Sequence, residues 1–242
     1  MRFYTPSWPA PHHVVALQTC RQGGFSLPPY NSLNLATHVK DARETVMRNR
    51  ALLPLPKSVG WLNQTHSDIC IELPCKDLAK PADASYTYLA EQVCVVLTAD
   101  CLPVLLTNKS GDFVAAVHCG WRGLANGLLA NTLTAINCNR QDLLVWLGPA
   151  IGPSAFEVGD DVYQFFMQQD PLYNKAFKSQ SIEGKFLANI YDLAKIQLRQ
   201  LGAHNIYSDE LCTYTQSSQY FSFRRDGQTG RQASFIWMKN SY

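Results

Sequence analysis

The chain has 242 residues, which is enough for one large domain or two small ones. Hydrophobic residues make up 46% and charged residues 17%, a composition typical of a globular protein and not of a disordered chain. The net charge of +2 is too small, and the basic residues are too scattered, to indicate a surface that binds nucleic acid or an anionic membrane.

The N-terminal segment has no apolar core of signal-peptide length, and no segment approaches the roughly 18 apolar residues that a membrane span needs. Eight cysteines occur at irregular spacing. Without an export signal, such cysteines are more typical of reduced thiols or metal ligands than of a disulfide framework. We therefore expect a cytoplasmic protein. No repeat or flexible linker divides the sequence, which favours a single domain over residues 1–242.

The N-terminal part of the chain is predicted to contain one helix among several strands. The expected elements are a strand at 14–20, a helix at 42–53, and strands at 59–66, 69–73 and 93–100. Asp41 is the expected N-cap of the helix, and Pro54 is expected to end it. The run at 93–100 is almost entirely apolar, which is typical of a strand buried on both faces.

Strands and helices continue to the C-terminus. The expected elements are strands at 101–107 and 112–121, helices at 124–136, 160–168 and 189–201, and strands at 143–148, near 206 and at 235–238. Pro103 indicates that its strand lies at a sheet edge or begins irregularly. Because the strands cluster with helices before and after them, the order favours a layered α+β fold over a regular alternation of strand and helix.

Three residues with metal-binding side chains lie at or next to predicted strand ends: His66, Cys101 and His118. Two imidazoles and one thiolate suit zinc and leave a fourth position open, as in catalytic zinc sites, where the pKa of bound water falls to about 7. From spacing alone, ordinary core or surface roles remain the alternative. Cys119 follows His118 directly, so its side chain should point to the opposite face of the strand and pack in the core.

Three glycine-rich segments carry arginine: residues 21–24, 120–123 and 223–231. Glycine allows close approach of the backbone, and the guanidinium fork matches phosphate. These segments predict an anion pocket that includes Arg21, Gly24, Arg122 and Arg224, and the alternative is a set of surface turns. Two further polar residues each have two interpretations. Asn34 is either a substrate donor or a turn amide, and Asp100 either orients a ligand or caps a strand.

Seven motifs in order resemble one protein family: RQGGFS, YNSLNLATHVKD, NQTHSD, TADCLPVLL, AVHCGWRGL, LGPAIGPSAFEVG and SFRRDGQTGR. It is the laccase-domain, or multicopper polyphenol oxidase-like, family, which includes purine nucleoside phosphorylases and a bacterial peptidoglycan-editing factor. The resemblance implies a single-domain α-β-β-α sandwich with mixed sheets and zinc, rather than copper, bound by His66, Cys101 and His118. Ser67, where the family usually has glycine, and Cys119 are departures that affect the expected substrate preference.

The resemblance implies phosphorolysis of adenosine, inosine, guanosine or methylthioadenosine, with adenosine deamination as a side activity. The partners are then purine nucleosides and phosphate, with no nucleic acid and no membrane, and both a monomer and a homodimer remain open. For this activity, we expect Cys101, His118 and Arg122 to serve catalysis and Arg21, Gly24, Asn34 and Arg224 to bind substrate.

Two other functions remain as alternatives. One is a hydrolase that edits peptidoglycan precursors, with Cys101 as nucleophile and His118 as base. The other is a copper polyphenol oxidase, which is disfavoured because a trinuclear copper cluster needs more histidines than the six in this chain can supply.

Overall fold

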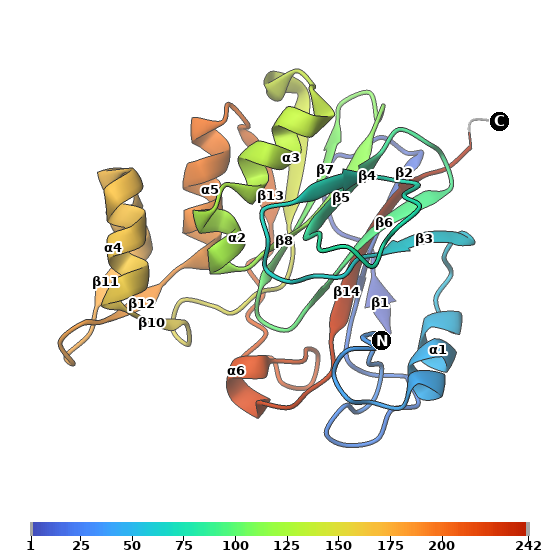
Figure 1. The fold of residues 1–242 in the computed structure, drawn as a ribbon, viewed down its shortest axis with the longest axis horizontal. Helices are drawn as coiled ribbons and strands as arrows, with labels where there is room; N and C mark the ends of the chain where they lie inside the picture. Colours follow the sequence, from blue (N-terminus) through green and yellow to red (C-terminus); the bar gives the residue numbers. More distant parts are fainter. Residues whose placement is uncertain (1, 241–242) are drawn as a thin grey trace.

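Two β-sheets packed face to face form the centre of the computed structural model, which describes residues 2–240 (Figure 1). The first sheet contains, in spatial order, β1 (Phe3–Tyr4), β2 (Val14–Thr19), β14 (Gln232–Met238), β6 (Gln92–Thr98) and β3 (Ser58–Trp61). The second contains β13 (Asn205–Ser208), β9 (Leu143–Leu147), β7 (Leu102–Asn108), β8 (Val114–Cys119), β5 (Ala84–Thr87) and β4 (Cys70–Glu72). Both sheets are mixed, because each combines antiparallel pairs with at least one parallel pair.

Strand β6 is buried along its whole length, as its apolar run predicts. Side chains alternate along a strand, so Cys94 and Val96 enter the core between the two sheets. Val93 and Val95 point the other way, into the core that faces α1 (Arg43–Ala51). Burial on both faces explains why this strand lacks the polar alternation of a solvent-exposed strand.

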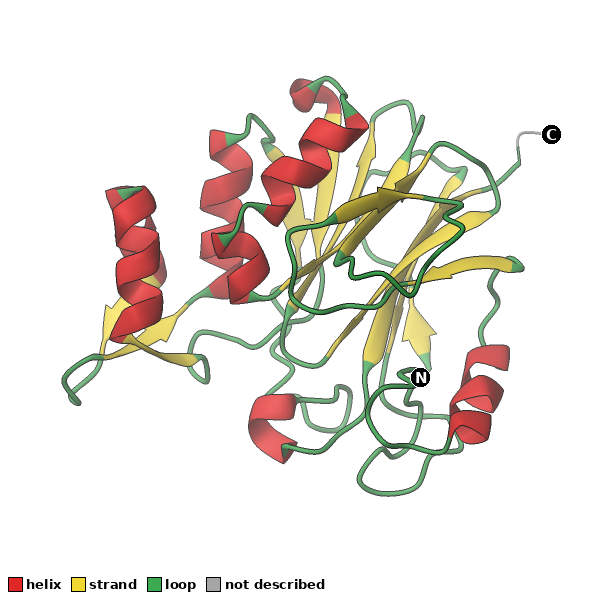
Figure 2. Cartoon of the chain, viewed as in Figure 1, coloured by secondary structure: helices red, strands yellow, loops and turns green. Residues whose placement is uncertain are grey.

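Helices cover the outer face of the six-stranded sheet, and α1 lies on the side of the five-stranded sheet (Figure 2). The six-stranded sheet is covered by α2 (Trp121–Ala125), α3 (Leu128–Ile136) and α5 (Ile190–Gln200), whose apolar side chains join the largest core cluster. The five-stranded sheet is covered by α1 and neighbouring loops. The expected four-layer α-β-β-α arrangement is therefore confirmed.

A small three-stranded sheet extends from one side of the molecule and was not expected from the sequence (Figure 1). It consists of β10 (Glu157–Gly159), β12 (Lys185–Ala188) and β11 (Phe177–Ser179), and it lies beside α4 (Asp160–Gln169). The remaining helical segments are η1 (Arg140–Asp142), η2 (Pro171–Ala176) and α6 (Phe223–Asp226). These strands are only three or four residues long, too short for a clear hydrophobic period.

Several expected element boundaries were wrong. The helix expected at 124–136 is divided into α2 and α3 by Gly127, whose φ of 84° lies in the left-handed region that glycine adopts readily. Asp41 is not the N-cap of α1: Ala42 is, and the Asp41 carboxylate instead accepts hydrogen bonds from Ser26 and Asn34. Strand β5 was missed.

Pro103 lies in β7, which pairs with β8 on one side and β9 on the other, so the expectation of an edge strand was wrong. Its position near the beginning of the strand agrees with the alternative of an irregular start, because pairing with β9 begins only at Val104. Within residues 2–240, no helix is long and apolar enough to cross a membrane.

Candidate active site

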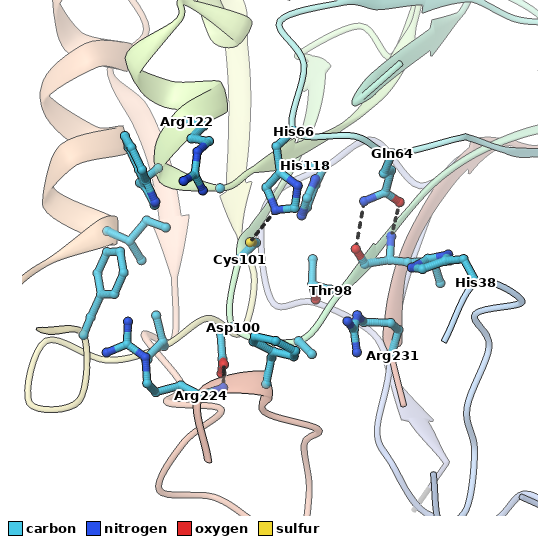
Figure 3. Close-up of a pocket in the computed structure, with 18 residues that line it drawn as sticks. His38, Gln64, His66, Thr98, Asp100, Cys101, His118, Arg122, Arg224 and Arg231 are labelled. Atoms are coloured by element: carbon cyan, nitrogen blue, oxygen red, sulfur yellow. Dashed lines mark hydrogen bonds between the residues drawn. The ribbon is translucent and has the colours of Figure 1, made fainter. Parts of the chain in front are cut away.

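A pocket of about 540 Å³ opens where β6 and β8 end, and His66, Cys101 and His118 all line it (Figure 3). Cys101 lies in the short connection between β6 and β7, and His118 is the second-last residue of β8. His66 does not end a strand as expected. Strand β3 stops at Trp61, and His66 lies in the following loop with a φ of 62°.

The three side chains form one group. Cys101 Sγ lies 3.7 Å from His66 Nε2, and the two imidazole ring centroids are 4.9 Å apart. One ligand atom from each residue lies within 4.8 Å of the other two, so the group can hold a metal ion. Two nitrogens and one sulfur match a three-ligand site with an open fourth position. His66 is exposed and His118 is 4% exposed, so the group lies between the pocket and the protein interior.

Asp83, which the sequence analysis missed, connects two of these three residues. Its Oδ1 accepts hydrogen bonds from His118 Nδ1 at 2.8 Å and from the His66 backbone N–H at 3.0 Å. Its Oδ2 accepts from the Ser67 N–H at 2.6 Å, the Ser67 hydroxyl at 2.7 Å and the Thr65 N–H at 3.1 Å. With Nδ1 of His118 donating to a carboxylate, Nε2 is left as the ligand atom. The only sequence signal for Asp83 is an acid among small residues beside a strand.

Charge interactions shift the pKa values of this cluster. Burial alone raises the pKa of Asp83, but the hydrogen bond and charge of His118, with the Ser67 contacts, outweigh burial and lower it to about 2. Burial likewise raises the pKa of Cys101, yet His118 and His66 lower it overall. Cys101 is therefore readily present as a thiolate, the form that binds metals and acts as a nucleophile.

The loop that carries His66 has a second attachment. The side-chain amide of Gln64 donates to the Leu97 carbonyl at 2.9 Å and accepts from the Leu97 N–H at 2.8 Å (Figure 3). The amide thereby replaces a strand partner beyond the point where β3 stops pairing with β6. The Asp83 and Gln64 contacts together hold His66 in place from both sheets.

Asp100 connects the turn before Cys101 to the C-terminal region. Its Oδ1 accepts a hydrogen bond from the Thr213 hydroxyl at 2.6 Å, and its Oδ2 accepts one from the Arg224 N–H at 2.7 Å. Its φ of 94° is unusual for a residue with a side chain. Asp100 therefore attaches the turn before Cys101 to Thr213 and Arg224. Neither interpretation made from the sequence describes these contacts.

Of the arginines expected to bind substrate, Arg122 and Arg224 line the pocket. The Arg122 guanidinium lies 4.4 Å from the centroid of the Trp121 ring. The Arg224 side chain donates to the carbonyls of Ala155 at 3.2 Å and Glu157 at 3.1 Å. Both guanidiniums are exposed, so they remain accessible to an anion entering the pocket.

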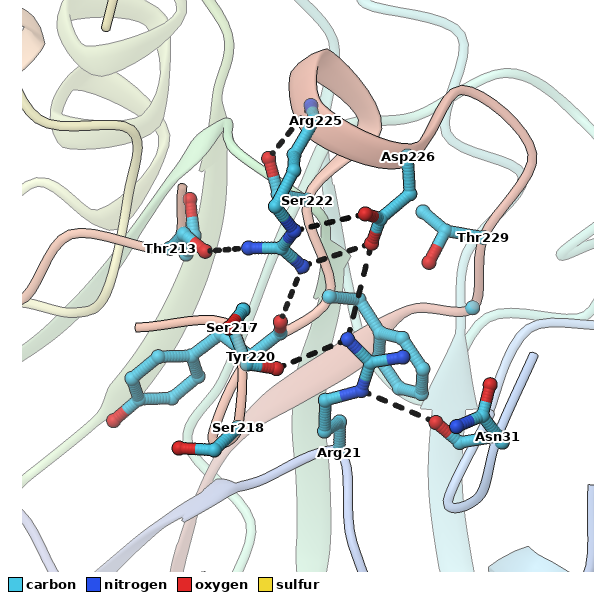
Figure 4. Close-up of polar contacts among 12 residues, drawn as sticks. Arg21, Asn31, Thr213, Ser217, Ser218, Tyr220, Ser222, Arg225, Asp226 and Thr229 are labelled. Carbon is cyan, nitrogen blue, oxygen red and sulfur yellow. Dashed lines mark hydrogen bonds and ion pairs between the residues drawn. The ribbon is translucent and has the colours of Figure 1, made fainter. Parts of the chain in front are cut away.

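Arg21 does not line this pocket but a separate polar crevice (Figure 4). Its Nε donates to the Asn31 carbonyl at 3.1 Å, and its Nη1 donates to the Ser217 carbonyl at 3.0 Å and lies 3.8 Å from an Asp226 oxygen. Arg225 pairs with the same carboxylate at 2.8 Å. In this structure Arg21 links the N-terminal loop to residues near the C-terminus and does not join the other two arginines.

Gly24 and Asn34 also lie outside the residues that line the pocket. A Cβ atom at position 24 would lie 2.3 Å from the Ser32 carbonyl oxygen, so glycine is needed there for backbone packing. Asn34 is fully buried, and its amide donates to the Ala36 carbonyl and Asp41. Its Oδ1 accepts from the backbone N–H groups of Ala36 and Arg231. The turn-amide interpretation of Asn34 describes these contacts.

Several pocket residues were not singled out as site residues by the sequence. His38, expected to be a surface or outer residue, is exposed and lines the pocket, as do Thr98, Phe223 and Arg231. Cys119 is 0% exposed and packs in the large core, as expected. The glycine-rich segment at 223–231 is the sequence signal for Arg231. The sequence alone does not show which of its arginines, Arg224, Arg225 or Arg231, faces the pocket.

Comparison with known proteins identifies the family. A family model described as "Multi-copper polyphenol oxidoreductase laccase" matches residues 15–239. The chain belongs to this family. A "Purine nucleoside phosphorylase" of Haemophilus influenzae is 46% identical over 244 residues, covering 99% of this chain and 100% of the relative. "Purine nucleoside phosphorylase YfiH" of Escherichia coli is 46% identical over 242 residues, covering 98% and 99%.

Solved structures of this laccase-domain family share the fold. The Neisseria meningitidis protein NMB0706 superposes with a TM-score of 0.93 at 44% identity, covering 99% of this chain and 100% of the other. YlmD from Geobacillus stearothermophilus gives a TM-score of 0.87 at 28% identity, covering 99% of both chains. The resemblance read from the motifs and the single α+β domain that it implied are confirmed.

Proposed function

We propose that this protein is a zinc-dependent purine nucleoside phosphorylase. The observation that carries the proposal is one pocket, about 540 Å³ in volume, that joins the His66, Cys101 and His118 group to the guanidiniums of Arg122 and Arg224. This volume suits a small-molecule ligand. The names of relatives that are 46% identical over almost the whole chain support the same activity.

The reaction requires an anion site and stabilisation of the departing base. Phosphate oxygen forms a bond to the anomeric carbon as the carbon–nitrogen bond to the purine breaks, through a transition state with oxocarbenium character. Arg122 and Arg224 attract and orient phosphate. Phe223 and Trp121 provide apolar surface for the purine and exclude water from the reacting atoms.

Residues around the metal group hold its side chains in position. Asp83 holds the Nδ1 proton of His118, and Gln64 and Asp83 hold the His66 loop. When bound to this group, Zn²⁺ would supply a Lewis acid beside the substrate and lower the pKa of coordinated water. That chemistry also supports the second part of the proposal, a side activity that converts adenosine to inosine. The proposed phosphorolysis substrates are adenosine, inosine, guanosine and methylthioadenosine.

Product analysis tests this function. Zinc-loaded protein is incubated with adenosine in the presence and absence of phosphate. Adenine and ribose 1-phosphate should form only with phosphate, and inosine should form in both reactions if deamination occurs. Failure of zinc-replete protein to convert any of the four nucleosides would reject the proposal.

A second candidate function is supported by the same residues. Cys101, His118 and Asp83 have the identities of a nucleophile, a base and a carboxylate that orients the base. This arrangement would serve a metal-free hydrolase that edits peptidoglycan precursors. Chelator-treated protein distinguishes the two functions, because hydrolysis of a precursor peptide would survive metal removal whereas the proposed phosphorolysis would not.

The side chains do not support a four-copper oxidase. Within residues 2–240, His66, Cys101 and His118 are the one group of three or more potential ligands close enough to share a metal. A multicopper oxidase needs a separate trinuclear cluster held mainly by histidines, in addition to such a site. Our proposal therefore does not include phenol oxidation, although the family description names an oxidoreductase.

A further inference from the structure

Arg231 is held in the wall of the pocket by backbone contacts. It precedes β14, and its Nη1 donates to the carbonyls of Thr229 at 2.9 Å and Gly230 at 3.0 Å. Its backbone N–H donates to Asn34 Oδ1 at 3.0 Å, and its carbonyl accepts from the Leu35 N–H at 3.2 Å. Contacts on both sides of the residue therefore fix where the guanidinium lies before any ligand arrives.

The charge of Arg231 is half-buried and lacks a carboxylate partner. Among the described residues, no acidic side chain lies within 4.0 Å of it, whereas Arg21 and Arg225 both pair with Asp226. Nε and Nη2 of Arg231 have no hydrogen-bond acceptor within the described part of the chain. A partly desolvated charge without a counterion is costly, so an anion bound beside it would be stabilised.

The direction of the side chain agrees with such a site. Figure 3 shows the Arg231 guanidinium pointing toward Thr98 and the side of the pocket that holds Cys101. Burial lowers the pKa of Arg231, and the charges of Cys101 and Asp100 oppose this effect. The Asp100 oxygens accept hydrogen bonds from Thr213 and Arg224, so Asp100 does not form an ion pair with Arg231.

Thr98 adds an unpartnered hydroxyl to this region. It is the last residue of β6, lines the pocket and is 1% exposed. Its Oγ1 has no hydrogen-bond partner among residues 2–240. Buried hydroxyls normally have a partner, so this one is available to a ligand that reaches the pocket wall. His38 lies near the same wall (Figure 3).

We propose that Arg231 forms the main phosphate subsite of this pocket, with the Thr98 hydroxyl as a further donor on the pocket wall. The ligand is a tetrahedral oxyanion that accepts two parallel hydrogen bonds from Nε and Nη2 of Arg231. Arg122 and Arg224 then attract the anion at the exposed side. The role of phosphate as a substrate rests on the proposed phosphorylase function. The subsite itself can be tested by phosphate binding alone, without measuring activity.

Isothermal titration calorimetry of zinc-loaded protein with inorganic phosphate, in the absence of nucleoside, tests the subsite. Arg231→Gln should raise the dissociation constant about a hundredfold, and Arg231→Lys, which keeps the charge but not the fork, about tenfold. Thr98→Val should weaken binding by a smaller factor. Arg199→Gln, which removes an exposed charge from α5, serves as the matched control and should leave the isotherm unchanged.

Three outcomes would overturn the subsite. The first is a wild-type protein that does not bind phosphate, and the second is binding that Arg231→Gln and Thr98→Val leave unchanged. The third is binding that is lost in Cys101→Ala but kept in Arg231→Gln, which would assign phosphate to the metal. If phosphate binds as expected but no nucleoside is converted, the subsite stands and the proposed function fails. Circular dichroism of each variant establishes that it is folded.

Discussion

Asp83 accepts a hydrogen bond from Nδ1 of His118 at 2.8 Å, and the same carboxylate oxygen accepts the backbone N–H of His66 at 3.0 Å. One buried acid thereby sets both the ring orientation of His118 and the backbone position of His66. The two histidines are 52 positions apart, and residue 83 lies between them on a third segment. The geometry of the candidate metal group therefore depends on a residue that does not itself face the pocket.

Replacing Asp83 with Asn should weaken metal binding. The amide cannot accept every hydrogen bond that the carboxylate accepts, so His118 and the His66 loop lose their fixed positions. Loss of such a supporting contact typically lowers metal affinity about 10- to 100-fold. Competition with a chromophoric chelator measures the zinc affinity. Asp68→Asn, at an exposed position two residues after His66, is the control and should leave the zinc affinity unchanged. An unchanged zinc affinity in Asp83→Asn would contradict the positioning role of Asp83.

Replacing Cys101 with Ala should abolish both zinc binding and phosphorolysis, because the thiolate is one of three candidate ligands. Cys119→Ala should keep both and cost only stability, since its side chain is 0% exposed in the core. Metal content by atomic absorption and product formation from adenosine check the pair. Full zinc content in Cys101→Ala would disprove the ligand assignment.

Replacing Arg21 with Gln should lower stability and leave phosphate kinetics unchanged. Its guanidinium binds two backbone carbonyls and lies near Asp226, away from the pocket. We expect the free energy of unfolding to fall by about 1–2 kcal/mol, as for loss of charged hydrogen bonds at a partly buried site. Urea unfolding and the KM for phosphate measure the two effects. A large rise in that KM with unchanged stability would restore Arg21 as a phosphate ligand.

Asp226 should make stability depend on pH at the acid end. Hydrogen bonds from Arg225 and the charges of Arg225 and Arg21 lower the pKa of Asp226, and partial burial opposes them less strongly. A carboxylate with a lowered pKa contributes stability above its unfolded value of about 3.9 and loses that contribution as the pH falls through the folded pKa.

The stability difference between wild type and Asp226→Asn tests this dependence. It should be roughly constant at about 1 kcal/mol between pH 5 and 8 and should shrink below about pH 4. Urea midpoints across this range measure it. Asp77→Asn, at an exposed ion pair with Lys80, is the control and should show no such trend. A difference that grows toward low pH would contradict the assigned direction of the pKa shift.

The sequence by itself determined the family, the layered α+β fold and the three candidate metal ligands. These follow from the chemical identity and order of residues along the chain, which the motifs preserve. The burial of β6 followed for a similar reason, because its apolar run is long enough to show that both faces pack. Short strands such as β10–β12 carry no such pattern and appear only when neighbouring segments pair.

The tertiary structure decided which polar residues serve the pocket. Arg21, Arg224 and Arg231 all lie in similar glycine-rich segments, yet packing directs the first into a separate crevice and the other two into the pocket wall. Asp83 acquires its role only when β5 brings it beside His118. Each of these outcomes depends on contacts between segments far apart in the chain. The residues around one polar side chain in the sequence do not show which distant group will form a hydrogen bond with it.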